Sequence, residues 1–337
     1  MKKIIVGVLG AGRIGQVHVQ AMHRTARVEI KAVADTYMND SMAKKLSQYG
    51  IKNITRNPKD IFDDEEIQAI FICSSTETHS EFSLQGIRAK KHIFCEKPVD
   101  MELDKIKEVR KALKKSPIVY QVGFNRRFDH NFIAARKAIH SNKIGTLRML
   151  RITSRDPAPP TLSYIKESGG LFMDMMIHDF DMARFQTGSE VEGLHAIAAV
   201  LVDKEIGKLG DVDTAIVSFQ CKNGTIGVIE NCRQASYGYD QRLEALGDKG
   251  SLCIGNDTES RLEISSNSGV LTEKPLPFFL ERYKEAYILE QKHFFDAIVK
   301  KKPAPCGIED GLESVRLAYA AKLSLKEGRP VSMSEIQ

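Results

Sequence analysis

Two side chains that can exchange protons, Asp174 and His178, stand four residues apart near the middle of the 337-residue chain. They lie in the segment GGLFMDMMIHDFDMARF (169–185), whose apolar residues recur at near-helical spacing and predict one mostly buried helix. A spacing of four residues would place both side chains on one face of that helix. The carboxylate would orient the imidazole. The unperturbed pKa of an imidazole, about 6.5, suits proton exchange at neutral pH.

The same pair has two other interpretations. A carboxylate on a helix often does no more than hold a histidine in place. A zinc site would need a third and a fourth ligand at characteristic spacing, and no nearby Cys or His supplies them, so no metal is expected. The acid–base interpretation is favoured because of what the rest of the chain contains.

The beginning of the chain carries a nucleotide-binding pattern. An apolar, β-branched strand over 4–9 is followed by G-A-G-R-I-G, a helix over 14–22 and a strand over 29–34 that ends at Asp35. Dinucleotide-binding folds require strand, G-x-G-x-x-G, helix and distant acid in this order. The residues of the turn expected to bind the cofactor are Gly10, Gly12, Arg13, Ile14 and Gly15.

Each glycine of this pattern has a physical role. Gly10 would permit the tight turn, Gly12 the approach of a pyrophosphate to the backbone, and Gly15 the close packing of helix and strand. The first turn of the helix would then offer its unpaired N–H groups to the phosphates. An ordinary strand–turn–helix connection would not require three glycines followed by an acid.

The acid at position 35 also predicts which cofactor is bound. A carboxylate accepts hydrogen bonds from the hydroxyls of the adenosine ribose but would repel a 2′-phosphate. Thr36 and Tyr37, which follow Asp35, provide no cation to bind such a phosphate. We therefore expect NAD rather than NADP.

Strands and helices continue to alternate up to residue 123, which predicts a doubly wound parallel sheet, that is, an α/β Rossmann domain over residues 1–123. Ligands of such sheets bind beyond the carboxyl ends of the strands. The polar residues expected at those ends, besides the glycine turn and Asp35, are Ser74, Ser75, Thr76, Glu96 and Lys97, and Arg127 follows the last strand.

The pattern changes in residues 124–337. A helix over 131–142 and the 169–185 segment accompany several strands, which are joined by turn sequences such as Lys222-Asn223-Gly224. This arrangement predicts an α+β domain with a large, open, mainly antiparallel sheet. Two helices, over 279–299 and 308–325, are expected near the end of the chain.

The composition excludes several classes of protein. A hydrophobic content of 42% and a charged content of 28% are typical of soluble globular proteins, and no run approaches the length of a membrane span. The net charge is +5, but the basic residues are scattered among acidic ones, which argues against nucleic-acid binding. Six separated cysteines without a C-x-x-C pair predict reduced thiols in a cytoplasmic protein.

The chain resembles the glucose–fructose oxidoreductase/inositol dehydrogenase (Gfo/Idh/MocA) family in four motifs and their order. These are G-A-G-R-I-G, Asp35, C-E-K-P (95–98) and D-M-M-I-H-D-F-D (174–181). The resemblance covers essentially the whole chain. Within the family, the segments F-N-R-R-F-D, S-R-D-P-A-P-P and Y-G-Y-D look most like those of inositol 2-dehydrogenases. The resemblance implies an NAD-dependent dehydrogenase that oxidises a cyclic polyol, most simply myo-inositol, and that commonly forms tetramers through its open sheet.

The resemblance also implies roles for individual residues. Lys97, Asp174 and His178 would form the catalytic set, and Arg127, Asp156 and Tyr239 would join Asp174 and His178 in contacting the substrate. Glu96 and Lys97 would lie beside the nicotinamide ribose. The Ser74–Thr76 loop and His79 would lie near the cofactor.

Two alternatives stay open at this point. One is a sugar or anhydrosugar dehydrogenase of the same family, with the same catalytic residues. The other is a non-catalytic, NAD-binding regulatory protein, which would not need to keep Lys97, Asp174 and His178. We expect a small polyol or sugar as the substrate and neither a nucleic acid nor a membrane as a partner.

Overall fold

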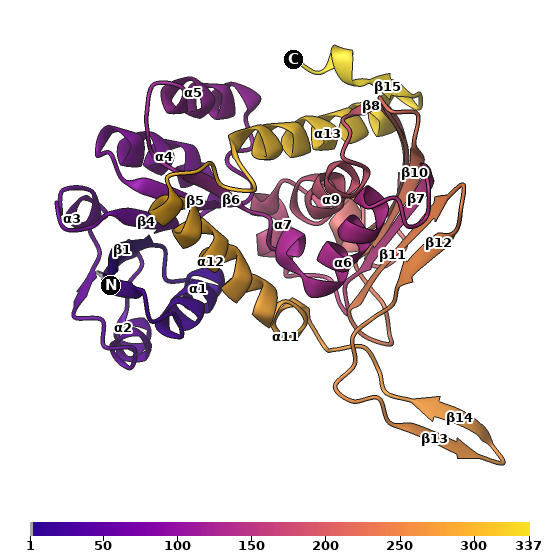
Figure 1. Cartoon of the computed structure of the whole chain (residues 1–337), viewed down its shortest axis with the longest axis horizontal. Helices are drawn as coiled ribbons and strands as arrows, with labels where there is room; N and C mark the ends of the chain where they lie inside the picture. The colour runs from indigo at the N-terminus through magenta and orange to yellow at the C-terminus, as the bar shows by residue number, and fades with distance from the viewer. Residues whose placement is uncertain (1–2) are drawn as a thin grey trace. The chain divides into compact units, whose positions relative to one another are not determined.

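A computed structural model describes residues 3–337 of the chain. The chain forms two compact units, and neither is a single stretch of sequence (Figure 1). The first unit ends at Phe128 and also contains Glu285–Glu313, and the second comprises Asp129–Lys284 and Ser314–Gln337. The first unit therefore contains residues 124–128 and 285–313, which the expected ranges place in the second domain. No local sequence pattern assigns residues 285–313 to the N-terminal part.

The first unit contains a six-stranded, entirely parallel sheet in the order β3-β2-β1-β4-β5-β6. Its strands are β1 (Ile4–Leu9), β2 (Val28–Ala34), β3 (Asn53–Thr55), β4 (Ala69–Ile72), β5 (His92–Glu96) and β6 (Tyr120–Gly123). Its helices include α1 (Arg13–His23), α2 (Asp40–Ser47), α3 (Lys59–Phe62), α4 (His79–Arg88), α5 (Leu103–Leu113) and α12 (Lys284–Lys300), with short 3-10 turns at η1 (Thr76–Thr78) and η2 (Asn125–Phe128). The expected doubly wound sheet is confirmed.

The core of this unit is aromatic and aliphatic. The strand β4 is buried along its whole length, as expected for a strand covered on both faces. Phe71 on β4 and Phe94 on β5 stack at 4.6 Å between ring centroids, and Phe294 of α12 contacts both rings edge-on. Burial of α12 residues in this core explains why a helix so late in the chain belongs to the first unit.

The second unit contains a seven-stranded mixed sheet in the order β12-β11-β7-β10-β9-β8-β15. Its strands are β7 (Leu147–Arg155), β8 (Val191–Ala199), β9 (Thr214–Cys221), β10 (Ile226–Cys232), β11 (Asp240–Gly247), β12 (Ser251–Ile254) and β15 (Val331–Ser332). All neighbouring strands are antiparallel except β7 and β10, which run parallel. The predicted open and mainly antiparallel sheet is confirmed.

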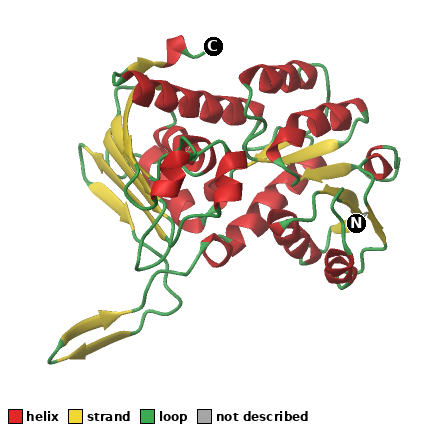
Figure 2. Ribbon diagram, turned by 180° about the vertical axis from the view of Figure 1, so that it is seen from behind, coloured by secondary structure: helices red, strands yellow, loops and turns green. Residues whose placement is uncertain are grey.

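Helices of the second unit lie on one face of its sheet, and no helix among residues 3–337 covers the other face (Figure 2). These helices include α6 (His130–His140), α7 (Leu162–Ser168), α8 (Leu171–Asp174), α9 (Ile177–Thr187), α10 (Lys204–Lys208), α11 (Phe279–Arg282) and the second part of α13 (Ile308–Glu327), and the short turn η3 is Met333–Glu335. Large apolar side chains are exposed on the strands, among them Met149, Ile197, Ile216, Ile226 and Leu246.

A separate hairpin projects from this unit (Figure 1). It consists of β13 (Glu263–Ser266) and β14 (Gly269–Thr272), which pair with each other and not with the large sheet. The sequence predicts only the first of these two strands, and places it at 262–264.

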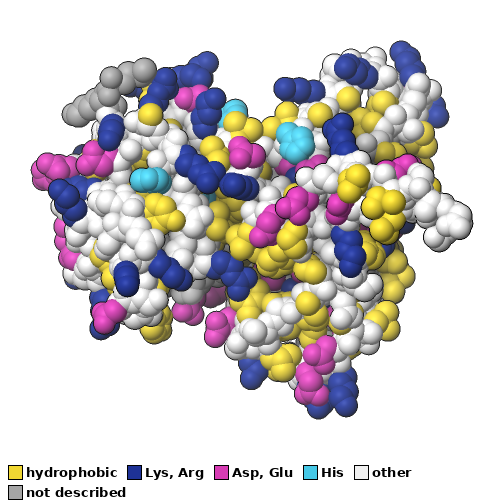
Figure 3. Space-filling model, turned by 90° about the horizontal axis from the view of Figure 1, so that it is seen from below, with side chains coloured by type: hydrophobic (Ala, Val, Ile, Leu, Met, Phe, Trp, Pro, Cys, Tyr) yellow, Lys and Arg dark blue, Asp and Glu magenta, His cyan; other side chains and the backbone are white. Residues whose placement is uncertain are grey.

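The surface and the helices agree with a globular protein. Acidic and basic side chains are interspersed over the face shown in Figure 3. Within residues 3–337, no helix is both long enough and apolar enough to pass through a lipid bilayer.

Candidate active site

The glycine turn has the geometry that a dinucleotide requires. Gly10 has a φ of +98°, and a Cβ there would lie 2.5 Å from the backbone of Cys73 and Ser74, so only glycine fits. A Cβ at Gly15 would lie 2.1 Å from the carbonyl oxygen of Gly10, which keeps helix and strand in direct contact. Gly12 is the N-cap of α1 without a side-chain cap, and a Cβ there would meet nothing within 4 Å. Open space at a helix N-terminus fits a pyrophosphate.

Asp35 is bound to this turn. Its Oδ2 accepts a hydrogen bond from the backbone N–H of Ala11 at 2.7 Å, and its Oδ1 accepts one from the N–H of Tyr37 at 2.8 Å. A carboxylate has about four acceptor sites, so these bonds orient it and still allow it to accept from ribose hydroxyls. Arg13 is exposed and Ile14 is half-buried at the start of α1. The residues present therefore fit NAD.

The loop after β4 is joined to the loop after β5 through His79. The Nδ1 of His79 lies 2.7 Å from the carbonyl oxygen of Pro98, and its Nε2 lies 3.0 Å from the carbonyl oxygen of Ser74. Burial would lower the pKa of His79, but Cys95 and these two carbonyls raise it to about 9. Because carbonyl oxygens only accept, both ring nitrogens donate, and the imidazolium holds the two loops together. Ser75 is exposed, and Ser74 and Thr76 are half-buried.

Glu96 and Lys97 occupy the carboxyl end of β5. Glu96 is buried, with its Oε1 2.7 Å from Nε2 of His18, and its Oε2 accepts the N–H of Lys97 at 3.2 Å. Lys97 is half-buried, and the peptide bond between it and Pro98 is cis. Lys97 is thus held at the edge of the sheet where ligands of parallel sheets bind.

Arg127 lies on η2 at the end of the same unit. Its Nη2 donates to Oδ1 of Asp310 at 2.8 Å, and its Nη1 donates to the carbonyl oxygen of Pro305 at 3.4 Å. Only 8% of Arg127 is exposed, so this is a largely buried ion pair. The contacts described here are with residues of the first unit.

In the second unit, one edge of the sheet brings Asp156 together with Arg233 and Tyr239, which lie more than seventy residues later in the sequence. The strands β7 and β10 are parallel, and Arg155 pairs with Cys232, so Asp156 and Arg233 follow the same end of the two strands. The strand β11 is antiparallel to β7 and begins at this edge, directly after Tyr239. Asp156 donates its backbone N–H to the carbonyl oxygen of Cys232 at 3.0 Å, which ties the two ends together.

Asp174 joins this edge through its carboxylate. Its Oδ2 lies 3.4 Å from both Nη1 and Nη2 of Arg233, and its Oδ1 accepts the hydroxyl of Tyr164 at 2.9 Å. Arg233 is 1% exposed and is among the largest fully buried side chains of the chain. A charged guanidinium at this distance favours the ionised form of a carboxylate.

The expectation that Asp174 and His178 lie on one helix is wrong. The structure has two helices here, α8 ending at Asp174 and α9 beginning at Ile177. The hydrogen-bond ladder changes register between them, because the N–H of Met176 bonds five residues back to Leu171 and that of His178 only three residues back to Met175. Spacing in sequence therefore does not define a shared face at this point.

The start of α8 depends on a glycine and an acid. Gly170 has a φ of +84°, and a Cβ there would lie 2.5 Å from Oδ1 of Asp211. The carboxylate of Asp211 accepts the backbone N–H of Leu171 at 3.0 Å and so caps the helix that ends at Asp174.

Sequence reasoning did not find Arg233 and Tyr164. Arg233 stands alone after a strand, and its importance depends on β10 pairing with β7, which no local pattern reveals. Tyr164 lies in the short helix α7, within residues 156–168, for which the sequence predicts a loop. Of the predicted residues, Lys97 and Arg127 belong to the first unit, and Asp156, Asp174, His178 and Tyr239 belong to the second. Tyr239 is buried against Phe278 and Tyr283.

Comparison with protein families agrees with this division. Residues 4–124 match an oxidoreductase family with an NAD-binding Rossmann fold, and residues 132–253 match the Gfo/Idh/MocA C-terminal domain. Among the relatives of this chain, myo-inositol 2-dehydrogenase of Thermotoga maritima is 43% identical over 98% of this chain and 99% of its own length. Inositol 2-dehydrogenase of Rhizobium meliloti is 44% identical over 97% of this chain and 98% of its own length.

Solved structures agree as well. A probable dehydrogenase from Thermotoga maritima superposes with a TM-score of 0.96 and 43% identity, over 99% of this chain and 100% of that chain. A scyllo-inositol dehydrogenase from Lactobacillus casei, solved with NAD(H) and scyllo-inositol bound, superposes with a TM-score of 0.92 and 26% identity over 99% of this chain and 100% of that chain. The resemblance drawn from the motifs is confirmed, and the chain belongs to the Gfo/Idh/MocA family of oxidoreductases, with an NAD-binding Rossmann domain as its first domain.

Proposed function

We propose that this protein is an NAD-dependent dehydrogenase that oxidises a secondary hydroxyl of a cyclic polyol, with myo-inositol as substrate and 2-keto-myo-inositol (scyllo-inosose) as product. The observation that carries this proposal is the full-length similarity, at 43–44% identity, to two proteins named as inositol 2-dehydrogenases. The cradle formed by Gly10, Gly12 and Asp35 supports the choice of cofactor, because the carboxylate of Asp35 would repel a 2′-phosphate.

In this proposal Gly10, Gly12, Arg13, Ile14, Gly15 and Asp35 hold the dinucleotide, together with Ser74, Ser75, Thr76, His79, Glu96 and Lys97. Bound NAD supplies the hydride acceptor of the reaction. Arg127, Asp156 and Tyr239, with Asp174 and His178, hold the polyol. Residues 1–123 are thus proposed as the cofactor domain and 124–337 as the substrate and assembly domain.

The catalytic residues divide the work on one hydroxyl group. A carbinol carbon gives up its hydride only as its hydroxyl loses a proton, so the site needs a base at neutral pH. His178 takes that proton on its imidazole, and Asp174 orients the ring. Lys97 donates a hydrogen bond to the same oxygen and stabilises its developing negative charge. A free lysine, with a pKa of about 10.4, would be a poor base at neutral pH without strong perturbation.

The contacts of Asp174 support its part in this scheme. A base-orienting carboxylate must remain ionised and fixed, and Arg233 and Tyr164 provide a cation and a hydroxyl donor for the two oxygens of Asp174. A non-catalytic NAD-binding protein would have no need to fix a carboxylate in this way.

The experiment is an assay of NADH production by the purified protein with inositol isomers, glucose, xylose and levoglucosan. We expect myo-inositol to give the highest kcat/KM, with NAD preferred over NADP. A higher kcat/KM for glucose, xylose or levoglucosan would favour a sugar dehydrogenase, and no turnover of any polyol would favour a regulatory protein.

We further propose a cytoplasmic homotetramer that assembles through the uncovered face of the second unit's sheet. On that face Leu246, Met149 and Ile226 are register partners on three adjacent strands, and Ile197 and Ile216 are partners on the next two. Each of these side chains is between 41% and 66% exposed. Exposed apolar side chains on an uncovered sheet face are typical of a protein interface.

A further inference from the structure

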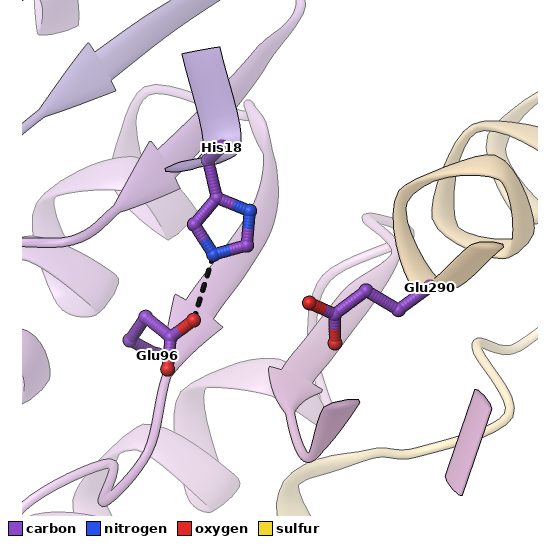
Figure 4. Close-up of side chains that lie close together, drawn as sticks. All are labelled: His18, Glu96 and Glu290. Atoms are coloured by element: carbon purple, nitrogen blue, oxygen red, sulfur yellow. Dashed lines mark hydrogen bonds and ion pairs between the residues drawn. The ribbon is translucent and has the colours of Figure 1, made fainter. Parts of the chain in front are cut away.

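Three buried titratable side chains meet inside the first unit (Figure 4). They are His18 on α1, Glu96 at the end of β5 and Glu290 on α12, and each contributes an atom that lies within 4.8 Å of the other two. Exposure is 0% for His18, 6% for Glu96 and 0% for Glu290. The proposed mechanism makes no use of His18 or Glu290.

The protonation of His18 follows from its two neighbours. Gln291 places its side-chain nitrogen 2.8 Å from Nδ1 of His18 and 3.2 Å from the main-chain oxygen of the same residue. A carbonyl oxygen only accepts, so the amide nitrogen must occupy this position and also donate to Nδ1. The ring proton is therefore on Nε2, which donates it to Oε1 of Glu96 at 2.7 Å. His18 is neutral.

The carboxylate of Glu96 is confined from three sides. Besides His18, it accepts the backbone N–H of Lys97 at 3.2 Å through Oε2. It also lies against Gly123 on β6, where a Cβ would come within 3.0 Å of its carboxyl carbon. A shift of this carboxylate would therefore be transmitted to the main chain at Lys97.

Glu290 differs from the other two because, within residues 3–337, neither of its carboxyl oxygens has a hydrogen-bond partner. Its helix is fixed there, since Gln121 donates to the main-chain oxygen of Glu290 at 3.0 Å. An ionised carboxylate with no partner in the interior costs several kcal/mol, and such groups take up a proton instead. The titratable groups that face Glu290 are His18, Glu96 and Cys73.

None of these neighbours favours a charge on Glu290. His18 is neutral, Glu96 accepts its hydrogen bonds as a carboxylate, and burial and the charge of Glu96 hold the pKa of the Cys73 thiol well above its ordinary value. Burial and the charge of Glu96 likewise raise the pKa of Glu290 well above 4.5.

We propose that Glu290 is a neutral carboxylic acid that acts as a positioning residue. Because Glu290 keeps its proton, Glu96 is the single charged group of the cluster, and Glu96 fixes the main chain of Lys97. The protonation stands independently, whereas its effect on activity rests on the proposed catalytic role of Lys97. When Glu290 loses its proton at alkaline pH, two carboxylates within 4.8 Å repel each other, and Glu96 no longer holds Lys97 in place.

The first test observes the proton directly. Protein labelled with carbon-13 at its glutamate carboxyl groups is titrated by NMR, and the Glu290 signal is assigned by its loss in Glu290→Gln. The exposed Glu285 on the same helix provides the control variant Glu285→Gln. If Glu290→Gln does not fold, Glu290→Asp supplies the assignment, because it also removes one glutamate signal.

We expect the Glu290 signal to remain that of a protonated acid at pH 7 and to titrate well above 4.5. A Glu290 signal that titrates near 4.5 would overturn the proposal. So would release of a stoichiometric divalent metal on denaturation, since the two carboxylates and the imidazole would then be metal ligands.

The second test concerns positioning. In the wild type, kcat/KM should fall about tenfold per pH unit above the pKa at which the Glu290 signal titrates. Gln cannot ionise, so in Glu290→Gln this fall of kcat/KM at alkaline pH should be absent, and in Glu285→Gln it should be retained. The affinity for NADH should not change over the same pH range. An alkaline limb that persists unchanged in Glu290→Gln would contradict the positioning role. If the wild-type protein shows the shifted Glu290 signal but oxidises no polyol, the result would instead count against the proposed function.

Discussion

Arg233 is a fully buried cation whose two terminal nitrogens lie 3.4 Å from the same carboxylate oxygen of Asp174. The pair connects the end of β10 to the end of α8, so it joins the sheet edge to the segment that carries His178. We therefore expect it to control how Asp174 is oriented in the reaction.

Replacing Arg233 tests this relationship. Arg233→Met keeps an unbranched apolar stem but removes the guanidinium with its donors and its charge, so we expect kcat/KM to fall about tenfold or more. The folded state should also lose about 1–3 kcal/mol, measured by urea unfolding, because Asp174 keeps a half-buried charge with one partner fewer. NADH affinity should hardly change, since the proposed cofactor residues lie in the other unit. Arg261→Met, at an exposed position, is the control. Unchanged turnover in Arg233→Met would mean that Asp174 does not depend on this pair.

The hydroxyl of Tyr164 offers a milder change at the same carboxylate. Tyr164→Phe removes only the donor to Oδ1 of Asp174, and Tyr164 is 47% exposed. Steady-state kinetics should therefore show a loss smaller than that of Arg233→Met, of about two- to tenfold. A greater fall of kcat/KM in Tyr164→Phe than in Arg233→Met would contradict the inference that Arg233 contributes more than Tyr164 to the orientation of Asp174.

Much of the first unit could be predicted from the sequence because its signals are local. The strand from Ile4 to Leu9, the glycine turn and Asp35 follow one another within a few dozen residues, and each has a direct steric or charge reason. The 169–185 segment was predicted less well. Its apolar periodicity is real, but the register shift between Asp174 and His178 depends on hydrogen bonds that sequence spacing cannot show.

What the sequence could not show is mostly long-range. Arg233 gains its role from a parallel pairing of β7 and β10 in a sheet that otherwise is antiparallel. In the sequence, Glu290 is an ordinary glutamate on a helix. Only the fold buries it next to Glu96, which lies 194 residues earlier in the chain. Short elements such as β3 and α3 are too brief for any periodicity to appear.

Cofactor preference should depend on the charge at position 35. Asp35→Ser combined with Thr36→Arg removes the carboxylate and adds a cation, so the ratio of kcat/KM for NAD to that for NADP should fall or reverse. Because Asp35 also accepts the N–H groups of Ala11 and Tyr37, some loss of affinity for both cofactors is expected. Better turnover of NADP than NAD by the unmodified protein would refute the role given to Asp35.

Stability should depend on pH through His79. Its pKa is about 9 in the folded protein and 6.5 when unperturbed, so its stabilising contribution is complete below pH 6.5 and is lost as the pH rises to 9. The difference in unfolding free energy between the wild type and His79→Asn should shrink by up to about 3 kcal/mol across this interval. A difference that stays constant from pH 6.5 to 9 would mean that His79 is neutral in the folded protein.

Assembly should depend on the uncovered sheet face. Ile216→Lys introduces a charge beside its register partner Ile197, and light scattering at micromolar concentration should then report a smaller species than the wild type. Val299→Lys, at a position 60% exposed on α12, should leave the assembly unchanged. A wild-type monomer would contradict the proposed tetramer.

The central claim is that Lys97 and His178 act on the reacting oxygen. Both groups should help mainly in the transition state, so Lys97→Met and His178→Ala should each lower kcat for myo-inositol by roughly two orders of magnitude or more. Asp174→Asn should cause an intermediate to severe loss of kcat, because it leaves the imidazole without its anionic partner. The losses in these variants should not add, because the residues act as a unit. NADH affinity, followed by fluorescence, should stay within severalfold of the wild type. The decisive measurement is kcat and NADH affinity in the same Lys97→Met and His178→Ala preparations: a large fall in kcat with retained NADH binding is predicted, and near-normal kcat, or loss of NADH binding in both, would contradict the account.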